Sequence, residues 1–552
     1  MANVKTLKNL LNRIFILNRR NLSLEFKLMQ REHQGLLSQG FYTKLAETID
    51  LISCRLRLSI DENAPTKLFA SISNSDFLLA YYQRLFSATL GNHDFRKAIL
   101  YSLTFDVPIW FPLKKTWQED LSGLGLKFNQ PICSTLIWMF QVHSSLRAIA
   151  RLLISEWDFW KRLVGRNQFL IETSADQKSI LLSGFSRGNF PSLHYPSHNF
   201  FDWVSDYYRE EINFIHDNEE LAREGHLREN LHFKKFFGLR SSWMNLLHSY
   251  LSLTVFLINI PKSRRVGFGK IFYLVDEVMI SIKIFECQKS LSLSHALFPS
   301  TYMVVKPLWA TQMERQGIEV VCVSYTAFAD PLNDSNNRIV NGVWHLSNWK
   351  VMWVVDQTQI NQMMMTSMKT SEKFITIGVP YWSGKIYVPP KELAGPFVSI
   401  FDTYIREDFF GAGTMEAMGW HNPALEIIFL ETILQVASEL GLTVLHKKKR
   451  QISKELDLVF EEKIKETKMR YSQIYHQIEP NYSADSIIEH SSVVVSKPLS
   501  TTAFIASQLN IPSLFFDPTG KVKVDDLGLR KCGLAHNHTD LKLLIQKALN
   551  LS

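Results

Sequence analysis

Residues 493–517 read VVVSKPLSTTAFIASQLNIPSLFFD. Val493–Ser496 is a short β-branched run that is typical of a buried strand, and Ser513–Asp517 is a second run of this kind. Between them, Ser500–Leu509 has the composition of a helix. A strand, a helix and a strand at this spacing predict a parallel sheet with crossover helices.

The same order of elements occurs on the N-terminal side of this stretch. Phe397–Asp402 predicts a strand, and a helix follows with Asn422 as its N-cap and Pro423 at its first position. Gly441 is expected to end that helix before a strand over Leu442–Leu445. Further predicted elements are a charged helix over 454–470, a short helix over 486–490 and a closing helix over 541–549.

A first α/β unit is predicted upstream of a linker-like segment over 385–396. Ala310–Gln316 predicts a helix that Gly317 ends, and Ile318–Val323 predicts the strand after it. Other strands are expected over 302–305, 350–355 and 374–379. The fold class is therefore α/β, with two doubly wound Rossmann-like units.

Residues 1 to about 290 are predicted to be mainly helical. Helix-like apolar spacing recurs in Leu7–Ile16, Thr43–Leu58, Phe77–Leu90 and Leu136–Leu153. The most apolar segment, Trp243–Ile260, is rather short for a bilayer crossing and is diluted by polar residues, so it predicts a buried helix, with an interfacial or reentrant element as the alternative. No transmembrane helix and no signal peptide are expected.

Length and charge narrow the class of protein. A chain of 552 residues with 46% apolar residues is too long for one core and predicts several folded domains. The net charge of +8 favours anionic partners, such as phosphorylated substrates or the surface of an anionic membrane. Nucleic acid is not expected, because the basic residues are spread along the chain. Five widely separated cysteines indicate reduced thiols in a cytoplasmic protein.

Three predicted strand ends carry polar residues, and ligands of open parallel sheets bind beyond such ends. Asp402 and Thr403 follow the first strand, His446, Lys447 and Lys448 end the second, and Lys497–Thr502 follows the third. The third end enters a helix directly, so backbone N–H groups, hydroxyls and the positive end of a helix dipole would meet there. This arrangement suits a phosphate, although Ser500 or Thr501 could instead serve only as a helix cap.

The sequence thus predicts a set of substrate-binding or nucleotide-binding residues. Tyr482, which precedes a short helix, is a candidate for contact with a base or ribose, or else a packing residue. The full set is Asp402, Thr403, His446, Lys447, Lys448, Tyr482, Lys497, Pro498, Ser500, Thr501, Thr502 and Asp517. No histidine pair has metal-ligand spacing, so neither a metal nor another cofactor is expected. Hydrolase, P-loop and dinucleotide motifs are absent from the sequence as well.

Residues 494–506 and 510–518 resemble the signature of the polysaccharide-biosynthesis proteins named for a Pro-Phe-Thr-Ser motif. Lys306–Trp309 with Glu314 and Gly317, Trp353–Asp356 and Gly378–Pro380 resemble other landmarks of that family. The resemblance covers roughly residues 300 to 530. Leu499 replaces the family's Phe, and Ser500-Thr501 stands where Thr-Ser is usual.

The resemblance implies a GT-B-like glycosyltransferase that makes capsule or lipopolysaccharide in bacteria. It implies donor binding by the C-terminal domain, acceptor binding by the N-terminal one, and a metal-independent reaction. Asp276 and Glu277 are candidates for the general base, although either could be an ordinary surface carboxylate. The expected divisions are a helical region over 1–290, the Rossmann-like part of the acceptor domain over 291–390, a nucleotide-sugar domain over 391–530 and a terminal helix over 531–552.

The expected activity is transfer of a sugar from a nucleotide-sugar donor to a glycan or lipid-linked glycan acceptor. A CMP-linked acidic sugar is favoured because the basic cluster could receive its carboxylate, and UDP- and GDP-sugars compete with it. The alternatives are a non-catalytic assembly protein on the same scaffold and a nucleotide-sugar epimerase. Peripheral contact with the inner face of the cell membrane is also expected.

Overall fold

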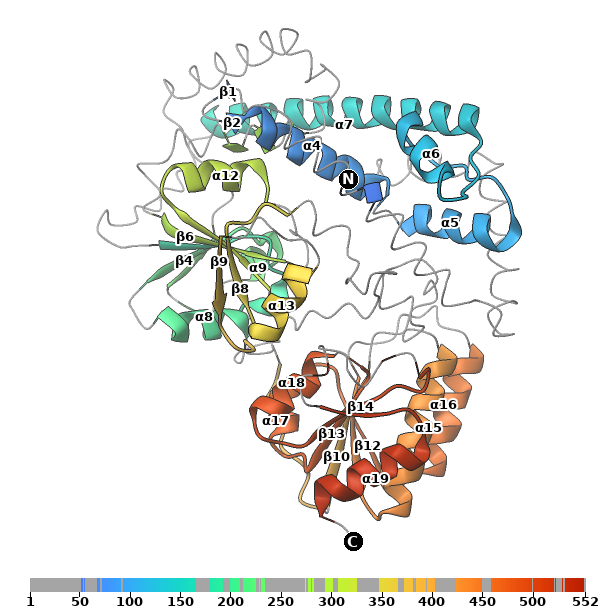
Figure 1. Ribbon diagram of the computed structural model, residues 1–552. Coiled ribbons are helices and arrows are strands. Elements are labelled where there is room, and N and C mark those ends of the chain that lie inside the picture. The colour runs from blue at the N-terminus through green and yellow to red at the C-terminus, as the bar shows by residue number, and fades with distance from the viewer. Residues whose placement is uncertain are drawn as a thin grey trace.

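Residues 493–517 form a strand, a helix and a strand in the computed structural model of the protein, as predicted (Figure 1). The structure describes residues 51, 52, 54, 67–69, 72–90, 93–164, 179–191, 199–208, 212–224, 228, 230–233, 274, 277, 278, 280, 281, 293–300, 306–324, 347–365, 372–380, 384–393, 395–402, 423–448, 458–498, 500–520, 522, 529 and 532–550.

The C-terminal unit is a six-stranded parallel sheet in the order β12-β11-β10-β13-β14-β15. Its strands are β10 (Phe397–Phe401), β11 (Thr443–Lys447), β12 (Tyr475–Ile478), β13 (Val493–Ser496), β14 (Ser513–Phe516) and β15 (Gly533–Ala535). Its helices are α15 (Pro423–Glu439), α16 (Leu458–Arg470), α17 (Ala484–Ile488), α18 (Thr501–Gln508) and α19 (His538–Leu549). Counted along the chain, the strand order is 3-2-1-4-5-6, which is that of a Rossmann fold.

This order creates a switch point between β10 and β13, where the chain crosses to opposite sides of the sheet. Both faces of the sheet are buried, so a strand such as β13 is buried along its whole length and is apolar up to its last residue, Ser496. On one face, Phe429 and Ile433 of α15 pack with Val495. On the other face, Ile487 of α17 and Ala506 of α18 pack with Val494.

The preceding unit is a seven-stranded parallel sheet in the order β5-β4-β3-β6-β7-β8-β9. Its strands are β3 (Ser179–Leu182), β4 (Asn213–His216), β5 (Leu231–Phe233), β6 (Leu293–Pro299), β7 (Glu319–Val323), β8 (Val351–Val354) and β9 (Lys373–Thr376). Its helices are α8 (Phe200–Tyr208), α9 (Glu219–Glu224), α12 (Leu308–Arg315) and α13 (Gln357–Met365), with a short 3-10 turn η1 (Arg187–Asn189). The sequence pattern missed β3, β4 and β5, which lie within the region expected to be mainly helical.

Helix α12 ends as the sequence predicts. Gly317 has a positive φ of 85°, and its N–H donates to the carbonyl of Glu314 at 3.0 Å. The N–H of Ile318 reaches back to the carbonyl of Met313 at 3.2 Å. These two bonds satisfy carbonyls at the helix end and direct the chain into β7.

Helices dominate the described residues before β3. They are α4 (Asn74–Ala88), α5 (His93–Phe105), α6 (Lys115–Ser122) and α7 (Gln130–Val164), together with a two-stranded sheet of β1 (Lys67–Phe69) and β2 (Ile72–Ser73). The predicted helices over 77–90 and 136–153 are confirmed as α4 and the interior of α7. None of the described helices has the length and apolar character that crossing a bilayer requires. The segments 7–16, 243–260 and 302–305 lie outside the described residues.

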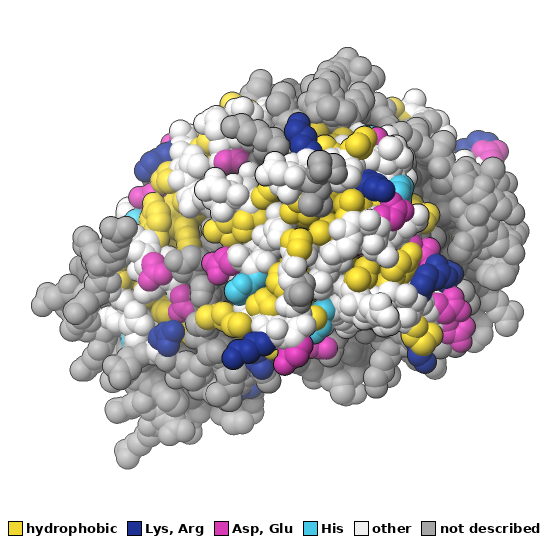
Figure 2. Space-filling view, turned by 90° about the horizontal axis from the view of Figure 1, so that it is seen from below, with side chains coloured by type: hydrophobic (Ala, Val, Ile, Leu, Met, Phe, Trp, Pro, Cys, Tyr) yellow, Lys and Arg dark blue, Asp and Glu magenta, His cyan; other side chains and the backbone are white. Residues whose placement is uncertain are grey.

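The predicted linker lies against the six-stranded unit. The N–H of Lys385 donates to the carbonyl of Asn481 at 2.7 Å, and the N–H of Ser483 donates to the carbonyl of Lys385 at 2.9 Å. Tyr387 is buried among residues of the β10 to α18 region. Figure 2 shows the described Lys and Arg side chains of one face as separate patches, several of them beside acidic ones.

Candidate nucleotide-sugar site

The carboxyl ends of β10, β11 and β13 meet at one edge of the six-stranded sheet. Phe401 is in register with Lys447 on one side and with Ser496 on the other. Asp402, which follows β10, therefore lies beside the residues that follow the two neighbouring strands. The structure thus brings together three predicted strand ends at the switch point between β10 and β13, where Rossmann-like sheets bind ligands.

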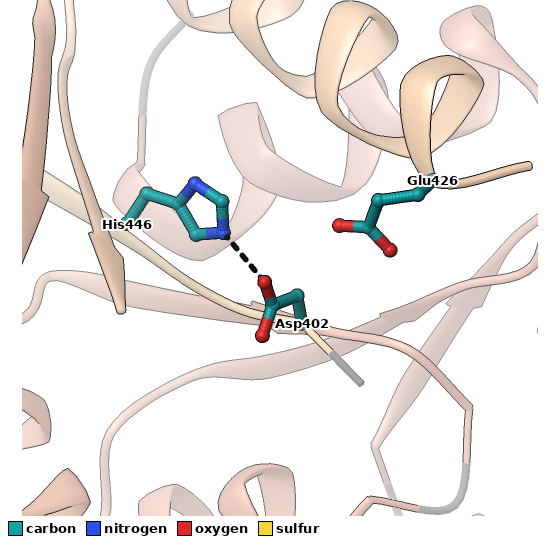
Figure 3. A group of neighbouring side chains, drawn as sticks. All are labelled: Asp402, Glu426 and His446. Carbon is teal, nitrogen blue, oxygen red and sulfur yellow. Dashed lines mark ion pairs between the residues drawn. The ribbon is translucent and has the colours of Figure 1, made fainter. Parts of the chain in front are cut away.

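Asp402 and His446 form a buried pair at this edge (Figure 3). His446 Nε2 is 3.3 Å from Asp402 Oδ2, and the two side chains are 3% and 7% exposed respectively. His446 Nδ1 is 2.8 Å from the hydroxyl of Tyr475 on β12. Burial, together with the carboxylates of Asp402 and Glu426, raises the pKa of Tyr475, so its hydroxyl stays protonated. When that hydroxyl donates to Nδ1, the imidazole carries its proton on Nε2, which faces Asp402.

A buried ion pair lies next to this cluster. Lys497 Nζ contacts Glu426 Oε2, and the two side chains are 3% and 2% exposed. The ammonium also lies 5.5 Å from the ring centroid of Phe429, which follows Glu426 on α15. Burial raises the pKa of Glu426, while the ammonium of Lys497 opposes that rise. Lys497 contacts Glu426 in this structure, and its role as a ligand contact stays a prediction.

The start of α18 presents hydroxyls without a conventional cap. Ser500 occupies the N-cap position, but its side chain makes no capping hydrogen bond. Its Oγ lies 3.2 Å from Thr502 Oγ1, which in turn lies 2.9 Å from Ser496 Oγ at the end of β13. Ser500, Thr501 and Thr502 are half-buried. This helix start combines hydroxyls with a positive dipole end, which is a suitable place for a phosphate.

Lysines accumulate on the β11 side of the same edge. Lys447 and Lys448 end and follow β11, and Lys468 reaches this region from α16. Burial, followed by the nearby charge of Lys448, lowers the pKa of Lys468 to about 8. The ammonium of Lys468 donates to Oε1 of Gln477 and lies 6.0 Å from the ring centroid of Tyr475. Neighbouring ammonium groups of this kind repel each other and would be stabilised by an anion.

Two other predicted residues have structural partners. Asp517 is fully buried, and its carboxylate accepts bonds from the backbone N–H groups of Thr519 at 3.0 Å and Val522 at 2.8 Å. It therefore fixes the turn after β14. Tyr482 packs edge-on against Tyr387, with ring centroids 5.4 Å apart. Pro498 is buried directly after Lys497.

The candidate bases lie in the other half of the chain. Glu277 is buried, and its two carboxylate oxygens accept bonds from Arg84 Nε at 2.7 Å and from the N–H of Leu308 at 3.0 Å. It thereby supports the first turn of α12. Asp276 and Thr403 lie outside the described residues. The role of Asp276 or Glu277 as a base stays a prediction.

The cluster also has the composition of a metal site. Asp402, Glu426 and His446 each offer a ligand atom, and these atoms lie within 4.8 Å of one another (Figure 3). A cation there would compete with the ammonium of Lys497, which already contacts Glu426. Glu426 could not be identified from the sequence, because an acidic residue in the first turn of a helix is common without any further role.

Residues 268–545, which make up half of the chain, match the family described as polysaccharide biosynthesis PFTS motif protein. The chain belongs to this family. The match begins before β6 and ends within α19, so it includes all six strands of the C-terminal sheet and four of the seven strands of the other sheet. The family resemblance carried by residues 494–518 is confirmed, as is the α/β fold with two Rossmann-like units.

The solved structures that are similar to this family member include three enzymes whose names contain UDP. One is a UDP-forming α,α-trehalose-phosphate synthase from Burkholderia vietnamiensis, with 10% identity over 68% of this chain and 90% of that one, at a TM-score of 0.39. Another is the UDP-GlcNAc 2-epimerase of Methanocaldococcus jannaschii, with 12% identity over 68% and 93% and a TM-score of 0.34. A UDP-glucosyltransferase from Polygonum tinctorium has 8% identity over 69% and 91%, at a TM-score of 0.36. Such low values do not identify an activity. No curated protein matches the chain.

Proposed function

We propose that the protein is a glycosyltransferase that moves a sugar from a nucleotide-sugar donor to a bacterial surface polysaccharide or lipopolysaccharide acceptor. The observation that carries the proposal is the meeting of the α18 start with lysines and a buried acid–histidine cluster at the switch point of the six-stranded sheet. Membership of a polysaccharide-biosynthesis family supports the class of substrate.

In this proposal the donor phosphate lies at the N-terminus of α18. The hydroxyls of Ser500 and Thr501 and the first N–H groups of the helix would donate to it. Lys447, Lys448 and Lys468 would add positive charge on the β11 side. These groups stabilise the negative charge that develops on the departing nucleotide, so the transfer needs no metal.

The reaction forms one bond and breaks another at the anomeric carbon of the donor sugar. The acceptor oxygen attacks this carbon, its proton passes to a general base, and the bond to the phosphate oxygen breaks as the nucleotide leaves. Asp276 and Glu277 remain the candidate bases. Glu277 would have to give up a bond to Arg84 or Leu308 to take that role.

A CMP-linked acidic sugar, such as a sialic-acid-like nonulosonate or Kdo, is the favoured donor, with UDP- and GDP-sugars as competitors. Lys448 and Lys468 would receive its carboxylate, since paired ammonium groups favour an anion. A glycan or lipid-linked glycan is the proposed acceptor. The net charge of +8 supports peripheral contact with an anionic membrane surface.

Replacing Ser500 and Thr501 together by Ala tests the donor site. Loss of two hydroxyl donors should weaken nucleotide binding by about 1–3 kcal/mol, measured by titration calorimetry with CMP, UDP and GDP. Thr135→Ala is the control, because that hydroxyl bonds only within its own helix, to the carbonyl of Pro131. Affinities that stay unchanged in the double variant would rule out this site.

Product analysis separates the proposed activity from the two alternatives. Nucleotide release that requires an acceptor glycan supports transfer, whereas a new nucleotide sugar without acceptor supports epimerisation. Binding without turnover of any donor supports a non-catalytic assembly protein.

A further inference from the structure

We infer that Glu426 is a positioning residue for the donor site, which acts by holding Lys497 and, through it, the segment 497–502 that begins α18. The inference rests on the proposed function for its ligand but on the structure for its geometry. Nothing in the sequence motif itself points to Glu426, which lies 71 positions upstream of its partner on α15.

The contact between Lys497 and Glu426 is buried on all sides. Both side chains are at most 3% exposed, and the ring of Phe429 covers the ammonium at 5.5 Å. An ammonium enclosed in this way does not reach a ligand at the surface of the crevice. Its position instead fixes the backbone at Lys497, directly after β13 and three residues before the α18 N-cap.

The pair joins the two connections that flank the switch point. Glu426 lies in the first turn of α15, the helix that follows β10, and Lys497 begins the connection from β13 to α18. Because β10 and β13 are adjacent and their helices cover opposite faces, the crevice opens between these two connections. The contact between Glu426 and Lys497 joins these two connections and thereby sets the positions of the hydroxyls of Ser500 and Thr501.

The neighbouring groups extend this network to the other strands. Asp402 follows β10 and lies near Glu426, and its partner His446 is tied to Tyr475 on β12. Asp402 and Glu426 repel each other, and the ammonium of Lys497 offsets part of that repulsion. Lys497 thus supplies the positive charge that a metal ion would otherwise bring to Asp402, Glu426 and His446.

Stability alone does not account for an ion pair at this place. A buried pair is often no more stabilising than well-packed apolar residues of similar volume, because both ions lose their hydration. What the pair adds is a fixed geometry, and here that geometry is the approach to α18. Replacing both partners with apolar residues therefore distinguishes the two roles. A pair that only stabilises the fold could be replaced without weakening nucleotide binding, whereas a pair that positions α18 could not.

The test uses the full chain with Glu426→Gln, and with Glu426→Leu combined with Lys497→Met. Among CMP, UDP and GDP, the nucleotide that binds the wild type best should bind both variants about tenfold more weakly, because small displacements of binding groups are costly. Thermal denaturation confirms folding, and the apolar double variant should unfold near the wild-type temperature. Amide hydrogen exchange in peptides over 497–505 should be faster in both variants.

Glu314→Gln is the matched control. Glu314 forms a buried pair with Lys306 at 2.6 Å in the seven-stranded unit, where the lysine side chain is 3% exposed. This variant should lose thermal stability but keep the wild-type nucleotide affinity and the wild-type exchange over 497–505.

Three results would overturn the inference. One is nucleotide affinity within twofold of the wild type in folded Glu426 variants. Another is unchanged amide exchange over 497–505, which is informative even if the wild type binds no nucleotide and the proposed function fails. The third is stabilisation of the wild type by Mn²⁺ or Zn²⁺ that Glu426→Gln abolishes, because the carboxylate would then hold a metal and not Lys497.

Discussion

Lys468 gives the sharpest electrostatic test of the group of lysines on the β11 side of the sheet edge. Its pKa lies at about 8 in the folded protein, against an ordinary value of 10.5, chiefly because of burial and then because of Lys448. Between these two pH values the unfolded chain binds more protons than the folded one, so stability rises with pH. Below about 8 the folded state carries the whole penalty of the charged amine. Because solvent screens part of this penalty, we expect the free energy of unfolding to rise by about 1 kcal/mol between pH values of about 8 and 10.5.

Lys468→Met should remove this pH dependence. Chemical denaturation of both proteins between pH 7 and about pH 10.5 measures it as a stability advantage of the variant that is largest near pH 7 and shrinks as the pH rises. Lys465→Met, on the exposed side of the same helix, is the control. Inorganic phosphate should reduce the difference by pairing with the ammonium groups, and a wild type that tracks the variant at every pH would contradict the assignment.

At this scale the sequence predicted the residues that stand on strand ends. Asp402, His446 and Lys497 were identified because a polar residue after an apolar run marks the carboxyl edge of a sheet. Glu426 and Lys468 were missed because they reach the edge from helices, and their meeting depends on packing between distant segments. The motif likewise did not reveal that Lys497 is buried.

Among the elements, the packing of the predicted linker at residue 385 depends on a glycine. A Cβ on Gly384 would lie 2.2 Å from the backbone nitrogen of Ser483, so Gly384→Ala must push the linker off the segment 481–483. We expect a loss of about 1–3 kcal/mol in unfolding free energy, and faster proteolysis within 385–393. Both are measurable by denaturation and limited digestion.

Gly441→Ala provides the comparison for that prediction. Gly441 has a positive φ of 64° and no atom within 4 Å of a Cβ, so alanine there meets only backbone strain. It should cost about 1 kcal/mol without exposing the linker to protease. Equal proteolysis in the two variants would show that docking of the linker does not depend on the close approach at Gly384.

The elements that the sequence predicted are those with long or regular apolar patterns. Strands β10, β11, β13 and β14 follow from apolar runs, and α15 follows from its proline start and glycine end. β12 is an edge strand with the mixed sequence Tyr-His-Gln-Ile, and β15 has three residues, so neither gives a clear pattern. The short strands β3, β4 and β5 were missed for the same reason, because tertiary pairing defines them more than local sequence does.

At the scale of the molecule, the two sheets have separate hydrophobic cores. One core contains Trp349 and Phe298, and another contains Phe429 and Val495, with no residue shared between the clusters. Among the described residues, each unit also holds a glutamate paired with a buried lysine, Glu314 with Lys306 and Glu426 with Lys497. Separate cores predict separate unfolding transitions.

Calorimetry of the full chain should therefore show two unfolding transitions. Variants of the two lysine–glutamate pairs should show which transition belongs to which unit. Glu314→Gln should lower only the transition of the seven-stranded unit, and Glu426→Gln only that of the six-stranded unit, because each leaves a buried lysine without its charged partner. Nucleotide at a hundredfold excess over its Kd should stabilise the second transition alone, by about 2.7 kcal/mol. A nucleotide that moved both transitions equally would mean that it binds to both units. Because the proposed donor contacts come from the C-terminal sheet alone, that result would relocate the donor site to contacts shared between the two units.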